Sequence, residues 1–311
     1  MEKKSEFLVY LQLIVVQLIW GGAFIIGQLA LTKQPVMTTL IIRNLGVSLG
    51  FILILCCSKK QEWLMMPRTA VWPLLGMGFF GVVMYNILAY WGLSLSSAIS
   101  ASLLIPTVQP LTTVLIAHIK AIDSLSKSQY WGLFAGFLGA IATLTGDWSI
   151  HPNLHTMLGN VLLLLAAFSF SLYSTLGKSV LNHLPPLHTT AYATIAGSIL
   201  FLPVSFLGDH QLILEHLTWD FGLYMGYLIV LGGVLSFLWW SHGVKYLGPS
   251  KTGMITLLMP PLALLIAVVV LQQAISLLQM IGIVLSLLGV GLSTGLVNVS
   301  TPFFVAINKK G

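Results

Sequence analysis

The stretch QLIWGGAFIIGQLALTK, from Gln17 to Lys33, is apolar over most of its length, yet it contains a tryptophan, three glycines and two glutamines. It belongs to an apolar run over residues 7–31, long enough to cross a bilayer, which needs about 20 such residues. Glycines in such a run allow close packing on a neighbouring helix. Polar and aromatic side chains among them also suit a helix that lines a path for a polar solute.

Comparable runs follow one another along the whole chain of 311 residues. Only 7% of the residues are charged, against roughly 25% in a soluble domain, and the mean hydropathy is +0.95. Because a lipid-exposed backbone must satisfy its polar groups within a helix or a closed barrel, and these runs are continuous, each is predicted to be helical. We expect an all-α integral membrane protein with ten transmembrane helices, over residues 7–31, 36–57, 70–92, 98–119, 129–146, 156–178, 188–207, 221–242, 251–271 and 278–298.

The distribution of lysine and arginine predicts the orientation of these helices. If the N-terminus is cytoplasmic, all but two of the 14 basic residues fall on the cytoplasmic side; the exceptions are Lys33 on the far side and Arg43 inside a span. This bias follows the positive-inside rule and predicts a multi-pass protein of the cell (inner or plasma) membrane with both termini in the cytoplasm. The net charge of +6 therefore reflects orientation, and no nucleic-acid partner is expected.

The two halves of the chain resemble each other at an offset of about 150 residues. Gly27 and Pro35 correspond to Gly177 and Pro185, and the glycine pattern of residues 132–139 recurs at 282–289. A repeated unit of five spans must enter the bilayer in opposite directions in its two copies, and such inverted repeats place a substrate site near the midplane between them. We expect one repeat over residues 1–150 and a second over 151–311, the latter ending in a short cytoplasmic tail.

Several stretches resemble the EamA-type family of the drug/metabolite transporter superfamily: LIWGGAFIIGQLAL in the first span, RNLGVSLGFILIL in the second, GLSLSSAISASLLIPTVQPLTTVLIA across the third and fourth, and SFSLYSTLGKSV in the sixth. The resemblance covers nearly the whole chain. It implies ten helices, cytoplasmic termini and a role in exporting or exchanging small metabolites, often amino acids.

Trp20 and Gln17 lie one helical turn apart in the first span and are candidates for the wall of a substrate cavity. An indole offers a ring face and an N–H donor. The alternative is that Gly21 and Gly22 serve close packing and Trp20 fills space beside them.

Arg43 is the formal charge inside a predicted span. Burying it costs at least about 2.5–3.5 kcal/mol, so it needs a partner or water, although its position near the outer third also allows it to snorkel. A structural or gating role is favoured over direct substrate binding.

Further candidates lie in the third and eighth spans. Asn86 must point away from lipid, toward substrate or a neighbouring helix, because a bare amide is costly in hydrocarbon. Tyr85 beside it is a candidate for the cavity wall, and Trp239 occupies a comparable place in the second repeat, where the neighbouring Trp240 is equally compatible with a belt residue at the membrane surface. The candidate substrate-binding residues are Trp20, Gln17, Tyr85, Asn86, Gln109, Tyr173, Trp239 and Thr256.

Four prolines interrupt the hydrogen-bond ladder inside paired spans. They are Pro106 and Pro110 in the fourth span and Pro260 and Pro261 in the ninth. The kinks they produce serve as hinges for alternating access or as static bends, and we favour hinges.

The sequence favours a carrier over two other classes of protein. An intramembrane enzyme would need a metal pair or nucleophile constellation, which the spans lack, and a scaffold would not need polar residues in the middle of its spans. No aspartate or glutamate lies in a span core, which favours facilitated diffusion or exchange over a proton-coupled antiporter. We expect a small-molecule substrate in an uncharged chamber, the lipid bilayer as surroundings, no cofactor and no metal; a monomer and a homodimer are both compatible.

Overall fold

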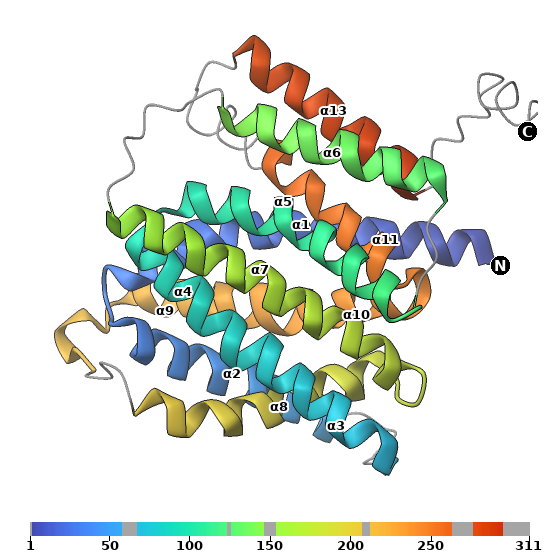
Figure 1. Cartoon of the computed structure of the whole chain (residues 1–311). Helices are drawn as coiled ribbons and strands as arrows, with labels where there is room; N and C mark the ends of the chain where they lie inside the picture. The colour runs from blue at the N-terminus through green and yellow to red at the C-terminus, as the bar shows by residue number, and fades with distance from the viewer. Residues whose placement is uncertain are drawn as a thin grey trace, which may run out of the picture.

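The computed structural model describes residues 2–57, 67–122, 126–145, 154–206, 212–262 and 276–294. Within these ranges the regular elements are helices, and no strand occurs. The first half contains α1 (Glu2–Leu31), α2 (Val36–Cys57), α3 (Arg68–Met77), η1 (Gly78–Met84), α4 (Tyr85–Leu95), α5 (Ala98–Ile119) and α6 (Lys127–Thr145). The second half contains α7 (Leu154–Leu181), α8 (Pro186–Ser205), η2 (Leu214–His216), α9 (Trp219–Gly226), η3 (Tyr227–Leu235), α10 (Ser236–Leu247), α11 (Pro249–Met254), η4 (Ile255–Leu258) and α13 (Leu277–Thr294). Figure 1 shows them packed side by side as a helical bundle.

The helices match the spans expected from the sequence. In the described part of the chain, seven helical stretches are long and apolar enough to cross a membrane: 6–31, 36–57, 68–95, 100–119, 154–181, 186–205 and 219–247. Helices α6 and α13 occupy the expected fifth and tenth spans. The ninth span is helical over residues 249–262, and the rest of the predicted segment 251–271 lies outside the described residues, as do the last residues of the segments 129–146 and 278–298.

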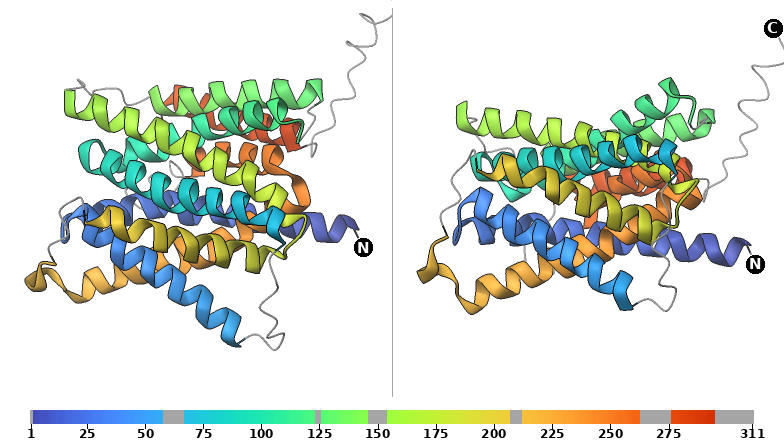
Figure 2. Two further views of the ribbon diagram at one scale, coloured as in Figure 1. Left: turned by 60° about the horizontal axis from the view of Figure 1, so that its bottom comes forward. Right: turned by 90° about the horizontal axis from the view of Figure 1, so that it is seen from below.

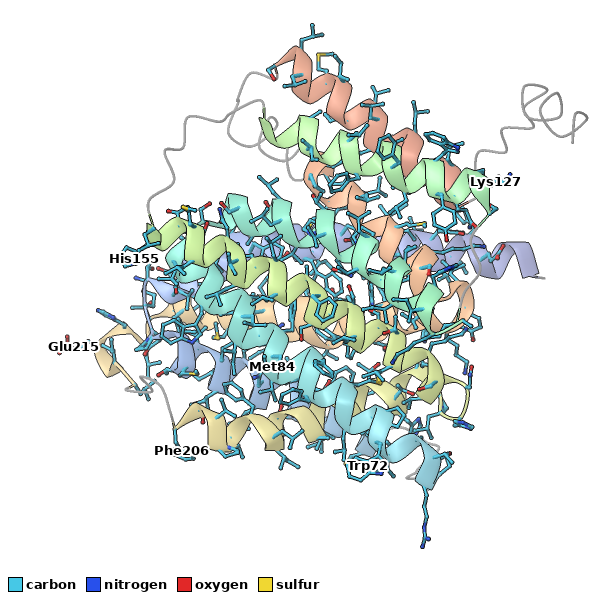
Figure 3. All side chains as sticks on the ribbon, viewed as in Figure 1. Trp72, Met84, Lys127, His155, Phe206 and Glu215 are labelled. Atoms are coloured by element: carbon cyan, nitrogen blue, oxygen red, sulfur yellow. The ribbon has the colours of Figure 1, made fainter. Side chains whose placement is uncertain are left out.

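The outer surface of the bundle is apolar, as a membrane protein requires. Leu49, Leu53 and Ile199 point outward and are 56%, 55% and 62% exposed. Soluble monomers rarely expose large apolar patches, and a surface with this many exposed apolar side chains suits contact with lipid. Figure 3 places Lys127 at the end of the bundle that holds the N-terminus, whereas His155 and Glu215 lie at the opposite end.

The two halves are related by an approximate two-fold axis. Helix α7 runs in the opposite direction to α1 (Figures 1 and 2). Where α2 meets α8, Ser48 Oγ donates to Ser198 Oγ over 2.8 Å, and Ser198 Oγ lies 3.2 Å from the carbonyl oxygen of Asn44. These two serines are 150 residues apart, which is the offset of the repeat, so equivalent residues face each other across the axis.

Helices α6 and α13 form a closely packed pair beside α5 and α11 (Figure 1). Gly139 lies against the backbone of α13, where an added Cβ would come 2.7 Å from the carbonyl oxygen of Gly282. At the equivalent position Gly289 lies against α6, where a Cβ would come 2.5 Å from Gly136 Cα and 2.7 Å from Gly132 O. The repeated glycine pattern thus makes a reciprocal contact of small residues, as transmembrane helices commonly use.

The prolines do not break α5, which continues through Pro106 and Pro110 from Ala98 to Ile119. Because Pro110 has no N–H, the carbonyl of Pro106 loses its intrahelical donor. The hydroxyl of Thr256 on η4 lies 3.1 Å from this carbonyl and 2.7 Å from that of Gly253, and shares its proton between the two. In the ninth span, the irregular backbone is the 3-10 turn η4, which ends before Pro260 and Pro261. These contacts fit bends that are held in place by a neighbouring helix, and the hinge role remains a prediction.

We expect Thr256→Val to lower the free energy of unfolding by about 1–3 kcal/mol, since it leaves a buried carbonyl without a donor. The valine has nearly the same shape, so packing is kept. Thermal unfolding in detergent measures the effect, and Thr32→Val, whose hydroxyl bonds an exposed carbonyl, is the matched control. Equal unfolding midpoints for the two variants would contradict the assigned bond.

Candidate functional site: a cavity between the repeats

Aromatic rings meet at the centre of the bundle. The centroid of Trp20 on α1 lies 5.4 Å from that of Phe170 on α7 in an edge-to-face arrangement, and 5.2 Å from that of Trp240 on α10. Trp20 and Phe170 are 150 residues apart and are therefore equivalent in the two repeats. Edge-to-face rings at these distances attract each other, so the two repeats meet here through an aromatic contact.

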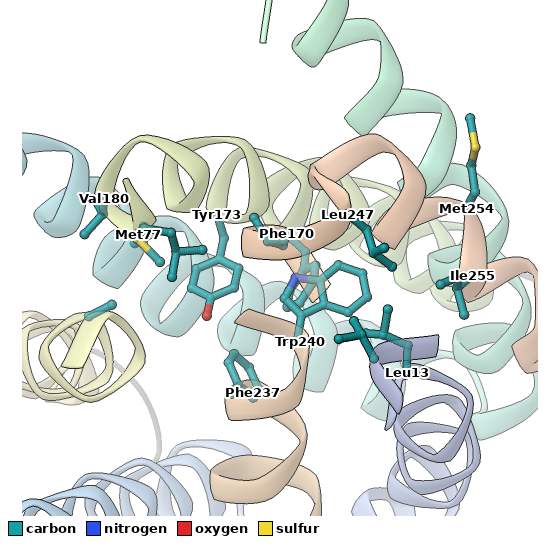
Figure 4. Close-up of a cluster of buried hydrophobic side chains, with 14 of the residues drawn as sticks. Leu13, Met77, Phe170, Tyr173, Val180, Phe237, Trp240, Leu247, Met254 and Ile255 are labelled. Carbon is teal, nitrogen blue, oxygen red and sulfur yellow. The ribbon is translucent and has the colours of Figure 1, made fainter. Parts of the chain in front are cut away.

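This aromatic contact divides the interior into two parts. Toward the N-terminal end of the bundle, Phe170, Tyr173, Phe237 and Trp240 pack into a continuous apolar cluster with Leu13 and Met77 (Figure 4). Trp240 is fully buried, and its indole N–H donates to Ser174 Oγ over 2.9 Å. In this conformation the path is closed on that side.

On the opposite side of the contact lies a cavity of about 40 Å³. That volume has room for about three water molecules. Its lining comes from both repeats: Trp20, Ala23, Phe24, Arg43, Tyr85, Asn86, Ala89, Tyr90, Leu93, Phe170, Leu228, Gly232 and Phe237. Because Ala23 and Phe24 follow Trp20 along α1, the cavity lies in the half of the bundle away from the N-terminus.

Four of the residues singled out in the sequence, Trp20, Arg43, Tyr85 and Asn86, are brought together in this lining. Arg43 is 7% exposed, and its Nη1 donates to Asn86 Oδ1 over 2.8 Å. Its guanidinium carbon lies 5.8 Å from the ring centroid of Tyr90, within cation–π range. Arg43 therefore points into the bundle and does not snorkel. The expectation of an uncharged chamber is wrong, because this cation is part of the lining.

The remaining candidates lie outside the lining. Gln17 is fully buried and bonds the carbonyl of Leu13 in its own helix, so the expectation that it faces the path is wrong for this conformation. Gln109 and Thr256 are buried between α5 and its neighbours, and Tyr173 lies in the aromatic cluster on the closed side. Trp239 is half-buried and is not among the residues that line the cavity. The adjacent Trp240 contacts Trp20 inside the bundle, so the interpretation of Trp240 as a belt residue is wrong.

The indole N–H of Trp20 is also not available to a solute. It donates to the carbonyl oxygen of Gly232 over 3.1 Å, and Tyr227 Oη on the same segment donates to the carbonyl of Ile19 over 2.9 Å. These two bonds fasten α1 to η3. Trp20 thus offers the cavity a ring face, contrary to the expected N–H donor.

The third and eighth spans each contain a π-helical segment, and the one in the eighth span contributes Leu228 and Gly232 to the cavity lining. Segments η1 and η3 occupy equivalent places in the repeats. Ser169 Oγ donates to the carbonyl of Phe80 in η1 over 2.7 Å, much as Trp20 does to Gly232 in η3. π-Helical turns are often found at functional sites, and here they present carbonyl groups to side chains of the neighbouring helices.

Sequence reasoning did not assign Tyr90, Phe170 or Phe237 to the site, and it left Trp240 open between the cavity and the membrane surface. The repeat offset carried a usable signal, because Trp240 is equivalent to Tyr90 and Phe170 to Trp20. Both members of each of these equivalent pairs are aromatic, and the members of one pair, Trp20 and Phe170, contact each other between the repeats.

The family model described as the EamA-like transporter family matches the chain twice, over residues 7–145 and 157–295. The chain belongs to this family. The double match assigns one EamA unit to each half, and the protein is a multi-pass membrane transporter with two inverted repeats.

Relatives of this chain are transporters as well. It is 28% identical over 195 residues to the uncharacterized transporter YyaM of Bacillus subtilis (strain 168), a match that spans 62% of this chain and 64% of that protein. It is 23% identical over 274 residues to the uncharacterized transporter YetK of the same organism, with 87% and 82% covered. A "Probable terminal-alkyne amino-acid exporter" of Streptantibioticus cattleyicolor is 28% identical over 205 residues, with 65% and 66% covered.

A solved crystal structure has the same fold. Its TM-score to this chain is 0.71, and the alignment covers 93% of this chain and 96% of the other. The sequences are 19% identical, so this likeness concerns the EamA fold alone.

Proposed function

We propose that this EamA protein exports or exchanges small amphipathic metabolites, amino acids or solutes of similar size, by alternating access and without an ion gradient. The observation that carries the proposal is the cavity between the repeats, lined by aromatic rings and Asn86 and closed toward the N-terminal side by the cluster around Trp240. A site between inverted repeats is reached from either side when the repeats exchange conformations.

Two further observations support the proposed solute and mechanism. The relative described as a probable amino-acid exporter favours solutes with amino-acid chemistry. Among the described residues that line the cavity there is no aspartate or glutamate, the side chains that usually carry protons inside a membrane. We further propose that both termini face the cytoplasm, which places the cavity in the extracellular half of the bundle.

The test combines metabolite profiling with reconstitution. In cells overproducing the protein, we expect a small set of amphipathic metabolites to increase in the medium relative to the cytoplasm. The same solutes should equilibrate across proteoliposomes that contain the protein, and a pH gradient should not concentrate them. Accumulation driven by the pH gradient would overturn the facilitative mechanism, and an absence of flux for every enriched metabolite would overturn the transport proposal.

A further inference from the structure

Arg43 is a buried cation that faces the cavity and has no anionic partner among the residues that the structure describes. Its one hydrogen bond to a side chain goes to the neutral amide oxygen of Asn86, and its Nε has no partner among the described residues. Asn86 in turn donates to Asn44 Oδ1 over 3.0 Å. A guanidinium has five N–H donors, so this arrangement leaves much of its hydrogen-bonding capacity unused.

The local chemistry favours an anion at this position. A cation away from water is costly unless a counter-charge and hydrogen bonds compensate for the lost hydration. None of the residues that line the cavity is acidic, so the protein does not supply the counter-charge there. A carboxylate fits the flat fork of donors of a guanidinium in a bidentate manner.

The second repeat does not reproduce this cation. At the offset of 150, Ala193 corresponds to Arg43 and Thr194 to Asn44, and Ser236, which corresponds to Asn86, donates its hydroxyl to the carbonyl of Leu231 within its own span. A residue needed to hold the helices of each repeat together would be expected in both copies. The charge is instead confined to one side of the aromatic contact, where the cavity lies.

We propose that Arg43, oriented by Asn86 and the ring of Tyr90, binds the carboxylate of the solute in this cavity. The rings of Trp20, Tyr85 and Phe170 receive the apolar part of the solute. An amino group is tolerated through these ring faces but is not required, because no acidic side chain in the lining recognises it. The inference rests on the proposed transport function and narrows its substrate to carboxylates with an apolar group.

The test measures binding to the purified protein by titration calorimetry in detergent. Because the cavity of about 40 Å³ must widen to admit a solute, probes of two sizes are used: butanoate against butanamide, and 3-phenylpropanoate against 3-phenylpropanamide. Phenylalanine against phenylalaninamide tests the amino group. We expect at least one carboxylate to bind about tenfold or more tightly than its amide. The amide lacks the charged hydrogen bond to Arg43, and losing such a bond weakens binding by about this factor.

Two variants assign this preference to Arg43. Arg43→Gln should make each carboxylate bind like its amide. Asn86→Asp places a carboxylate at the position of an atom that already accepts from Arg43. It loses the donor to Asn44 Oδ1, but a flip of the Asn44 amide, whose Nδ2 has no partner among the described residues, restores a hydrogen bond there. The variant should therefore keep the fold and equally abolish the preference. Asn160→Asp is the matched control, since Asn160 accepts a hydrogen bond from Ser96 on a segment outside the cavity lining, and it should leave the preference unchanged.

The outcomes separate this inference from the proposed function. Equal binding of carboxylates and amides by the unmodified protein, or a carboxylate preference that survives Asn86→Asp, overturns the assignment to Arg43. A carboxylate preference that disappears in Asn86→Asp supports it even if proteoliposomes show no flux, in which case the transport proposal alone fails. If amides and carboxylates instead cross the membrane at equal rates, and Asn86→Asp does not change these rates, the transport proposal is supported and the assignment of carboxylate binding to Arg43 fails.

Discussion

Gly289→Ala is expected to prevent recovery of folded protein from detergent. The added methyl group would come 2.5 Å from Gly136 Cα and 2.7 Å from the carbonyl oxygen of Gly132. Both are backbone atoms of α6, so no side chain can rotate away and the two helices must separate. Overpacking usually costs about 1–3 kcal/mol, and this contact should reach or exceed the upper end of that range.

The control is Gly222→Ala in α9, where nothing lies within 4 Å of an added Cβ. This change should be neutral or slightly stabilising, because alanine favours a helix over glycine by about 1 kcal/mol. Size-exclusion profiles and thermal unfolding of the two variants give the comparison. If Gly289→Ala were as stable as Gly222→Ala, the close packing of α6 on α13 would be wrong.

Trp20→Ala is expected to reduce solute flux in proteoliposomes to the level of empty liposomes. Trp20 forms the wall of the cavity, contacts Phe170 from the other repeat and bonds the carbonyl of Gly232. Alanine removes all three contributions. Trp20→Phe keeps a ring against Phe170 and loses the N–H, a change of about 0.5–1.5 kcal/mol, so it should retain part of the flux.

Trp72→Ala is the matched control, because Trp72 is 79% exposed on the outer surface. This variant should transport solute at the unmodified rate. Circular dichroism and monodispersity establish that each variant is folded. Flux at the unmodified rate in a folded Trp20→Ala protein would show that this residue does not belong to the solute path.

The spans were predictable because hydropathy alone determines them. Bilayer thickness dictates segment length, and the expected segments 36–57 and 98–119 coincide with α2 and α5. The repeat was also predictable, since equivalent glycines recur at a constant offset. The direction in which each side chain points was not, because helices that are apolar on all sides carry no clear periodicity.

Gln17 and Trp20 illustrate this difference. They lie one turn apart on the same helix, and composition assigned both to the path. The structure gives Gln17 a backbone carbonyl of its own helix as partner and turns Trp20 toward a carbonyl 212 residues away. That second partner lies in the π-helical segment η3, which no local sequence pattern near Trp20 signals. Arg43 was predictable as a residue of interest, but its lack of a counter-ion depends on which residues surround it.

The contact between Ser48 and Ser198 has a consequence for how motion in this protein can be followed. If the two repeats exchange conformations as proposed, two equivalent positions on the axis should keep their separation, and Ser48 and Ser198 are such a pair. Spectroscopic labels at the two serines would report a constant distance and calibrate the measurement. Tyr90 lines the cavity and Trp240, its equivalent, lies in the apolar cluster, so labels at these two positions should exchange environments in such a motion. The difference between the two label signals would then show toward which face of the membrane the cavity lies.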